Sequence, residues 1–173
     1  TVLMRTIVGL LTPTQGEVLY DGRSFYGLRK KERILMRREM GMIFQGAALF
    51  DSLTVRENVQ FPLDMFSDMT LRDREKRALE CLDRVNLTGA EDKYPGEISG
   101  GMQKRVAIAR AIVMNPKYLF CDEPNSGLDP KTSLVIDSLL TSITREFNTT
   151  TIINTHDMNS VMGIGENIIF ICD

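Results

Sequence analysis

The chain has 173 residues, of which 43% are hydrophobic and 25% are charged, and its formal net charge is -2. This length and composition predict one globular domain with a sizeable core, and the absence of a basic excess argues against nucleic acid as a partner. No apolar run approaches the roughly 18 residues that a membrane span requires, so we expect a soluble chain.

The first quarter of the chain predicts alternating helices and strands. Residues 2–11 are apolar at helical spacing and stop at Thr12-Pro13, which predicts a helix. Residues 16–23, "GEVLYDGR", alternate and end in Asp-Gly, which predicts a strand and a turn. The charged run 29–39 suits a solvated helix, and "MGMIFQ" at 40–45 predicts a short buried strand.

The pattern is helical from about Gly46 to Asn115. Thr70 has the form of a helix cap, and the apolar spacing after it predicts a helix that runs to about Asn86. Ser99 predicts the start of a second helix.

Strand-type sequence returns in the last third of the chain, where three β-rich runs alternate with helical stretches. The predicted strands are residues 118–123, 149–154 and 167–173, and the predicted helices are residues 130–147 and about 157–163. Such alternation predicts a parallel sheet with crossover helices. We therefore predict an α/β core in two pieces, interrupted by a helical insertion.

Cys81, Cys121 and Cys172 lie far apart, without a CxxC pair or a neighbouring histidine. Neither a zinc site nor a disulfide framework is indicated. We expect reduced, buried thiols.

Two adjacent carboxylates, Asp122 and Glu123, end the apolar strand in "PKYLFCDEPNSGLDP" at 116–130. Ligands of α/β sheets gather beyond the carboxyl ends of the strands. Asp122 could hold Mg²⁺ there, and Glu123 could accept a proton from an attacking water. Acidic residues also begin many helices that follow strands, so the pattern alone leaves both interpretations open.

A second candidate site is "ISGGM" at 98–102, which places Ser99, Gly100 and Gly101 at a helix start. The free backbone N–H groups and the positive end of the helix can bind a phosphate group with no side chain in the way. A lone SGG is more often simply a capped helix.

Taken in order, "ISGGMQKRVAIARAI", "PKYLFCDEPNSGLDP" and "INTHD" resemble the nucleotide-binding domain of ABC transporters, and the resemblance covers essentially the whole chain. "ISGGM" stands where the family signature reads LSGGQ. "SGLD" at 126–129, ending in Asp129, matches the D-loop, His156 the switch histidine and Gln45 the Q-loop glutamine. The resemblance implies a P-loop NTPase-type parallel sheet core with an inserted helical subdomain.

The resemblance also implies roles around ATP and Mg²⁺. Thr1, Asp122 and Gln45 would contact Mg²⁺, and Glu123 would activate water. His156 and Gln45 would sense the γ-phosphate. Each residue has a plainer alternative, because Gln45 could be a polar strand end, His156 a structural histidine and Asp129 a helix cap.

The family's Gly-rich phosphate loop, GxxxxGK[ST], has no match in the chain. "TVLMR" at 1–5 resembles the segment that begins with the last hydroxyl residue of that loop, so the resemblance implies a single ABC ATPase domain fragment, 1–173, incomplete at both ends. Within it, 1–46 and 116–173 would form the catalytic core, and 47–115 the helical subdomain with the signature motif. Without the loop we expect the 173-residue chain to bind MgATP weakly and to be a poor ATPase.

As partners, the resemblance implies a second copy, arranged head to tail around two ATP molecules, and an integral membrane permease at the cytoplasmic face of the inner membrane. The stretch "FQGAALFDSLTVRENVQFPL" at 44–63 is similar to ATPases of Mla/Mce-type lipid-transport systems, which makes phospholipid a candidate cargo. The ATPase of an importer for amino acids or ions, and a non-transport ABC ATPase of the translation-factor type, are the alternatives.

Overall fold

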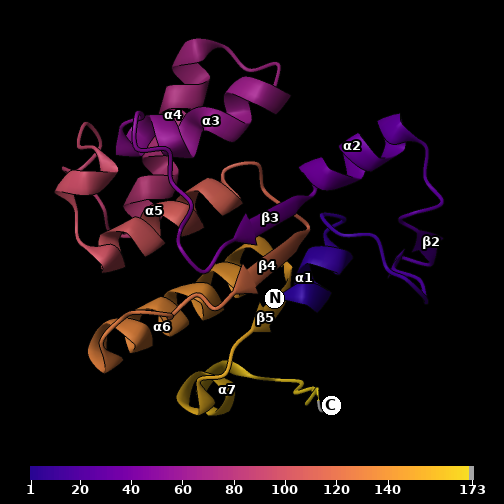
Figure 1. Cartoon of the computed structure of the whole chain (residues 1–173). Helices are drawn as coiled ribbons and strands as arrows, with labels where there is room; N and C mark the ends of the chain where they lie inside the picture. The colour runs from indigo at the N-terminus through magenta and orange to yellow at the C-terminus, as the bar shows by residue number, and fades with distance from the viewer. Residues whose placement is uncertain (172–173) are drawn as a thin grey trace.

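Three parallel strands form the centre of the molecule in the computed structural model, which describes residues 1–171. Their order is β3-β4-β5, where β3 is Met40–Ile43, β4 is Tyr118–Asp122 and β5 is Thr150–Asn154. Both neighbouring pairs are parallel, and helices connect them (Figure 1). The predicted α/β fold with a parallel sheet and crossover helices is therefore confirmed.

The central strand β4 packs on both of its faces. Leu119 and Cys121 belong to the larger hydrophobic cluster, while Phe120 belongs to a smaller cluster on the other side. Successive side chains of a strand point to opposite faces, so β4 separates two apolar layers. An apolar strand buried on both faces is typical of a parallel sheet.

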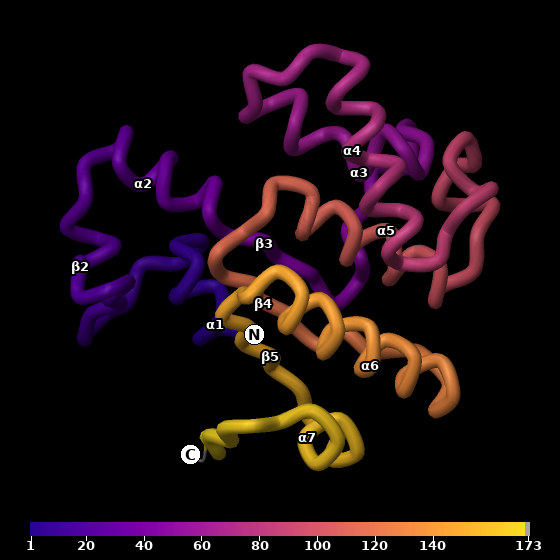
Figure 2. Tube along the Cα trace, turned by 180° about the vertical axis from the view of Figure 1, so that it is seen from behind, coloured from indigo at the N-terminus to yellow at the C-terminus, as the bar shows by residue number. Residues whose placement is uncertain are grey.

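The crossover from β3 to β4 contains four helices, and they gather at one end of the molecule (Figures 1 and 2). They are α3 (Val55–Phe66), α4 (Leu71–Arg84), the short 3₁₀ helix η1 (Pro95–Glu97) and α5 (Gly100–Ile112). Thr70 and Ser99 accept hydrogen bonds from the backbone N–H groups of Asp73 and Met102. The two predicted helix caps are thus confirmed.

Helix α5 lies so close to β3 that the strand needs a glycine. A Cβ atom added at Gly41 would lie 2.4 Å from the carbonyl oxygen of Ala111, a separation that no side chain can occupy. Glycine permits this approach of two backbones. The contact fixes the second half of α5 against the sheet.

Helix α6 (Pro130–Phe147) connects β4 to β5 and covers one face of the sheet. Its residues Ile136, Leu140 and Ile143 join the same cluster as Leu119 of β4. That cluster continues without a break into α3, α4 and α5. The division into a core and a helical subdomain at residues 46 and 116 therefore stays a prediction.

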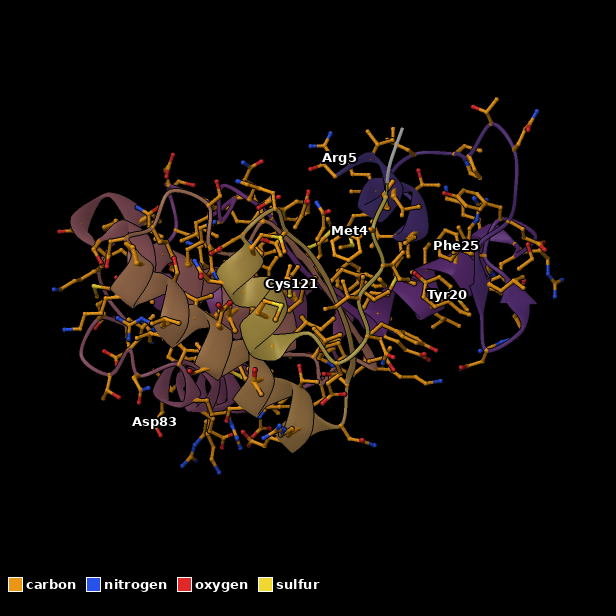
Figure 3. All side chains as sticks on the ribbon, turned by 90° about the horizontal axis from the view of Figure 1, so that it is seen from below. Met4, Arg5, Tyr20, Phe25, Asp83 and Cys121 are labelled. Atoms are coloured by element: carbon orange, nitrogen blue, oxygen red, sulfur yellow. The ribbon has the colours of Figure 1, made fainter. Side chains whose placement is uncertain are left out.

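The opposite face of β4 carries the N-terminal part of the chain. Its elements are α1 (Val2–Ile7), the antiparallel pair β1 (Leu19–Tyr20) and β2 (Arg23–Ser24), and α2 (Lys30–Arg38). Their apolar side chains form the smaller cluster together with Phe120; its buried members are Met4, Val8, Tyr20, Phe25, Met36 and Phe120. Figure 3 labels Met4, Tyr20 and Phe25 of this cluster.

Helix α1 is shorter than the predicted helix over 2–11. Gly9 has a φ of +80°, in the left-handed region, and follows the last turn of the helix. A residue in this conformation just after the last turn ends a helix, and glycine adopts it without steric cost. The apolar periodicity did not reveal this stop.

The C-terminal part differs from the prediction in one element. Helix α7 (Met158–Ile164) agrees with the predicted helix, but residues 167–171 do not form the predicted strand. A strand needs a neighbour that completes its backbone hydrogen bonds, and the ladders of the described residues pair no strand with this segment. Ile169 is 87% exposed. Residues 172–173 of the predicted strand lie outside the described residues.

Within residues 1–171, no helix is long and apolar enough to cross a membrane. Cys81 and Cys121 are buried, as predicted, and are free cysteines, while Cys172 lies outside the described residues. Burial raises the pKa of the Cys81 thiol to about 11.

Candidate functional site

Asp122 is the last residue of β4, and its side chain lies at the carboxyl edge of the sheet, as the sequence predicted. It is 3% exposed. Its Oδ1 accepts a hydrogen bond from the hydroxyl of Thr1 at 3.1 Å and another from the amide of Asn154 at 2.8 Å. Thr1 and Asp122, two of the three residues predicted to contact Mg²⁺, are therefore direct neighbours although they lie far apart in the sequence.

Glu123 follows in an unusual backbone conformation. Its φ is +50°, which is uncommon for a residue other than glycine and is found preferentially at functional sites. Its N–H donates to the carbonyl oxygen of Asn154 at 2.8 Å. This turn ends β4 one residue earlier than predicted, and the two neighbouring carboxylates have different partners, Thr1 and Asn154 for Asp122 and His156 for Glu123.

His156 is the partner of Glu123. Its Nδ1 lies 2.9 Å from Glu123 Oε1, and the His156 side chain is 84% exposed whereas the Glu123 side chain is 14% exposed. The hydrogen bond and the negative charge of Glu123 raise the pKa of His156 above its ordinary value. The predicted proton acceptor and the predicted γ-phosphate sensor thus meet at one point.

Gln45 lies just beyond β3, and its side chain is directed toward the same region. Its amide donates to the hydroxyl of Ser126 at 3.2 Å, and the Ser126 N–H donates to the carbonyl oxygen of Glu123 at 3.2 Å. A chain of two hydrogen bonds therefore connects Gln45 to the backbone of Glu123. The carboxyl ends of β3, β4 and β5, with the side chains they carry, are called the sheet edge below.

The residues Ser99, Gly100 and Gly101, called the signature turn below, lie apart from the sheet edge. In Figures 1 and 2 the start of α5 is well removed from the N-terminus of the chain, where Thr1 lies. Ser99 and Gly100 are exposed, and the hydroxyl of Ser99 only caps α5, accepting from Met102 N–H at 3.3 Å. The chain does not bring its two predicted phosphate-binding features together.

Asp129 caps α6, as the plainer interpretation of the sequence predicted. Its Oδ1 accepts hydrogen bonds from the N–H groups of Lys131 and Thr132, each at 3.1 Å. A hydrogen bond from the Thr132 hydroxyl, together with these backbone bonds, holds the pKa of Asp129 below its usual range. Thr132 also lies against the signature turn, because a Cβ added at Gly101 would be 2.8 Å from its methyl group.

The oxygen atoms of Asp122 and its neighbour Thr1 are suitable ligands for a magnesium ion. Mg²⁺ prefers hard oxygen ligands and is usually held by one or two protein groups together with waters and substrate phosphates. The Thr1 hydroxyl and the Asp122 carboxylate supply such oxygens side by side. Among the described residues there is no group of three or more His, Cys, Asp or Glu side chains that could form a complete metal site.

A cavity of about 660 Å³ lies next to Glu123 and His156. The segment that joins β4 to α6 lines it, together with the first residues of α6 and α7. Its lining includes polar side chains from three separate parts of the chain, among them Ser126, Ser133 and Asn159. The site is thus open to solvent on the side where His156 is exposed.

Two residues that the sequence analysis did not single out contribute to the site. Asn154, at the end of β5, binds Asp122 through its side chain and Glu123 through its backbone. Its place at a strand end next to "THD" was a usable signal. Lys104 of α5 donates to the carbonyl oxygens of Gln45 and Glu123, and nothing in the sequence pattern indicated this contact.

Known proteins resemble this chain over nearly all of its length. The family model described as ABC transporter matches residues 1–126. The methionine import ATP-binding protein MetN of Carboxydothermus hydrogenoformans is 44% identical over 166 residues, which are 96% of this chain and 49% of that protein. The probable ribonucleotide transport ATP-binding protein mkl of Mycobacterium leprae is 37% identical over 168 residues, 97% of this chain and 48% of that protein. The chain spans about half the length of these curated relatives.

Among solved structures, a similar one is the ATP-binding cassette MJ0796, in a dimeric post-hydrolysis state bound to ADP and Pi. The TM-score is 0.81 and the sequence identity is 38%, over 92% of this chain and 70% of that one. This likeness supports the fold that the sequence predicted.

Proposed function

Because the chain belongs to the ABC transporter family, we propose that it is the ATP-binding and ATP-hydrolysing part of a transporter. The observation that carries the proposal is the convergence of four predicted site residues at the sheet edge. Thr1 contacts Asp122, and Glu123 contacts His156, although these residues come from three distant parts of the sequence. Parallel α/β sheets commonly bind nucleotides beyond the carboxyl ends of their strands.

The residues at the edge divide the chemistry between them. Thr1 and Asp122 would hold Mg²⁺, which supplies positive charge that neutralises the phosphates of ATP. The Glu123 carboxylate accepts a proton from the attacking water, and its backbone turn directs it for that purpose. His156 has an exposed ring that can donate a hydrogen bond to the γ-phosphate while its Nδ1 faces Glu123. Gln45 lies one hydrogen bond from the Ser126 turn and can detect whether the phosphate is present.

The signature turn is proposed to serve the ATP molecule of a second copy. It lies away from the sheet edge of its own chain and presents exposed backbone N–H groups at the start of α5. Such a helix start stabilises a phosphate group by hydrogen bonding and by its dipole. A head-to-tail dimer would bring it to the other sheet edge, and the dimeric state of the similar cassette bound to ADP and Pi supports this arrangement. Asp129 would lie near the same interface while it caps α6.

The remaining partner would be a permease in the inner membrane, with this chain attached at the cytoplasmic face. Two relatives are named for methionine import and for ribonucleotide transport, and these names favour a transporter of small polar molecules. Phospholipid, which the stretch 44–63 suggested, is the second cargo to be tested. The names of the relatives support transport rather than a translation-factor role.

The proposal is tested with the protein in its full natural length. We expect it to release phosphate from MgATP, and we expect Glu123→Gln to abolish release while ATP stays bound. Cells that lack the gene would then be compared with normal cells for uptake of labelled methionine, uptake of nucleosides, and phospholipid composition of the membranes. A defect confined to one of these identifies the cargo. A purified protein that neither binds nor hydrolyses ATP would contradict the proposal.

A further inference from the structure

Lys104 is a buried cation in an unexpected place. It lies on α5, five residues after Ser99, and it is only 6% exposed. None of the ion pairs between described residues includes it. Burial of an ammonium group is costly unless hydrogen bonds compensate it, and burial lowers the pKa of this one. Its contacts should therefore explain why it is there.

The ammonium group of Lys104 reaches two backbone carbonyls at the sheet edge. It donates to the carbonyl oxygen of Gln45, and it lies 3.5 Å from that of Glu123. Gln45 follows β3 and Glu123 follows β4, so one side chain spans the ends of two neighbouring strands. The two residues are those proposed to sense the γ-phosphate and to accept the proton.

A second cation of the same helix holds the chain that follows Gln45. The guanidinium of Arg110 donates to the carbonyl oxygens of Ala47 and Ala48, each at 2.8 Å. Both alanines have positive φ, 60° and 50°, which is unfavourable for residues with a Cβ and persists only where surrounding contacts impose it. Helix α5 thus holds residues 45–48 through side chain to backbone contacts.

We propose that Lys104 is a positioning residue that couples the signature turn to Gln45 and Glu123, and so connects the two ATP sites of the dimer. The inference rests on the proposed function. The signature turn begins α5 and serves the ATP of the second copy, whereas Gln45 and Glu123 serve the ATP of their own chain. A displacement of α5 when its start binds phosphate moves the Lys104 ammonium, and with it both carbonyls.

The neighbouring residue offers a matched control. Arg105 lies on the same helix and also donates to backbone carbonyls, those of Val85 at 3.2 Å and Asn86 at 2.9 Å. These carbonyls lie at the end of α4, so Arg105 makes the same kind of contact without reaching the sheet edge. Replacement of either cation by methionine removes one charge and the hydrogen-bond donors from α5 and leaves an unbranched apolar side chain.

The experiment compares Lys104→Met, Lys104→Arg and Arg105→Met in the full-length protein. Hydrogen exchange of the peptide that covers residues 44–50 reports on the contact itself and requires no hydrolysis. We expect exchange about tenfold faster in Lys104→Met, and unchanged in Arg105→Met. Steady-state kinetics should show kcat lowered about tenfold in Lys104→Met with KM changed less than about twofold, because ATP binding is preserved and only the alignment of Glu123 is lost.

Lys104→Arg keeps the charge, and we expect it to retain kcat within about threefold of the natural protein. If Lys104→Met does not fold, Lys104→Leu, which also removes the charge and the hydrogen-bond donor, takes its place with the same expectations. The inference is overturned if hydrogen exchange or kcat is the same in Lys104→Met as in Arg105→Met. It is also overturned if Lys104→Arg loses as much kcat as Lys104→Met. A natural protein that hydrolyses no ATP contradicts the proposed function instead, and hydrogen exchange still decides whether Lys104 holds residues 44–50.

Discussion

The sheet edge and the signature turn are both predicted to bind phosphate, but the chain completes only the first. At the sheet edge, Asp122 is bonded to Thr1 and Asn154, and Glu123 is bonded to His156. At the signature turn, Ser99 and Gly100 are exposed, and the Ser99 side chain caps α5. One region is a connected set of side chains, and the other is an exposed helix start.

This difference indicates separate tasks for the two regions, catalysis at the sheet edge and binding of a second molecule at the signature turn. A carboxylate that must accept a proton has to be oriented by neighbours, and the fold supplies these neighbours within one chain. A helix start needs no such support, because its N–H groups and dipole are fixed by the backbone. It can therefore be presented to a ligand held by another molecule. Damage at the sheet edge should impair chemistry, and damage at the signature turn should impair assembly.

The largest effect is expected for Glu123→Gln at the sheet edge. The amide keeps the shape of the side chain but accepts no proton, so turnover should fall about a thousandfold while ATP stays bound. Phosphate release and retention of labelled ATP measure both effects. Glu17→Gln is the control, because Glu17 is exposed and distant in sequence from the motifs. Turnover that is unchanged in Glu123→Gln would exclude this residue as the base.

A smaller loss, about a hundredfold, is expected for Gly100→Asp at the signature turn. The added carboxylate repels a phosphate group at the helix start, whereas the sheet edge of the same chain is not altered. ATP binding to the separate protomer should therefore be preserved, which fluorescence of a labelled ATP analogue can measure. Equal loss of ATP binding by the separate protomer would mean that the signature turn serves its own chain.

Asn154→Ala tests the support of Asp122. Removal of the 2.8 Å hydrogen bond frees the carboxylate to rotate, and the loss of such a supporting contact typically weakens metal binding or activity about tenfold or more. We expect turnover to recover in part when the Mg²⁺ concentration is raised. A matched change, Asn159→Ala on α7, lies outside the contacts of Asp122 and should leave the Mg²⁺ dependence as it was. An Asn154→Ala protein with a normal Mg²⁺ dependence would contradict this role.

The smallest effect is a shift in the titration of His156, the only histidine of the chain. Because Glu123 raises its pKa, the ring should be half protonated at a pH above the ordinary 6.5 in the nucleotide-free protein. The attraction between the two residues is fully present below pH 6.5 and is lost as the pH rises through the raised pKa. Because the chain has one histidine, NMR of its ring protons as a function of pH gives the midpoint of the His156 titration directly. Glu123→Gln should return it toward 6.5, and equal midpoints in both proteins would count against the pair.

Much of the fold was predictable because residues close together in the sequence determine where its helices and strands begin and end. The cap at Thr70, the buried strand before Asp122 and the long helix after Asp129 are each determined by neighbouring residues. The segment 167–171 was not, because its apolar residues predict a strand whether or not a partner strand is in reach. The early end of α1 was also not predicted, because it depends on the positive φ of the single residue Gly9 and not on the apolar pattern.

The candidate site shows the same limit. Motif order indicated Asp122, Glu123, His156 and Gln45, because each stands at the end of a predicted strand. Motifs say nothing about which side chains complete the contacts between strands. Asn154 stands at a strand end and so left a signal in the sequence, whereas only the three-dimensional arrangement shows that Lys104 of α5 reaches the sheet edge.

The most direct test of the account is the native mass of the full-length Glu123→Gln protein in MgATP, with and without Gly100→Asp. We predict that Glu123→Gln alone forms a dimer that retains two ATP molecules, and that Gly100→Asp in addition removes both the retained ATP and the ATP-dependent dimer. ATP retained equally by the double variant, or ATP held by single protomers that never pair, would contradict a site shared between the sheet edge of one copy and the signature turn of the other.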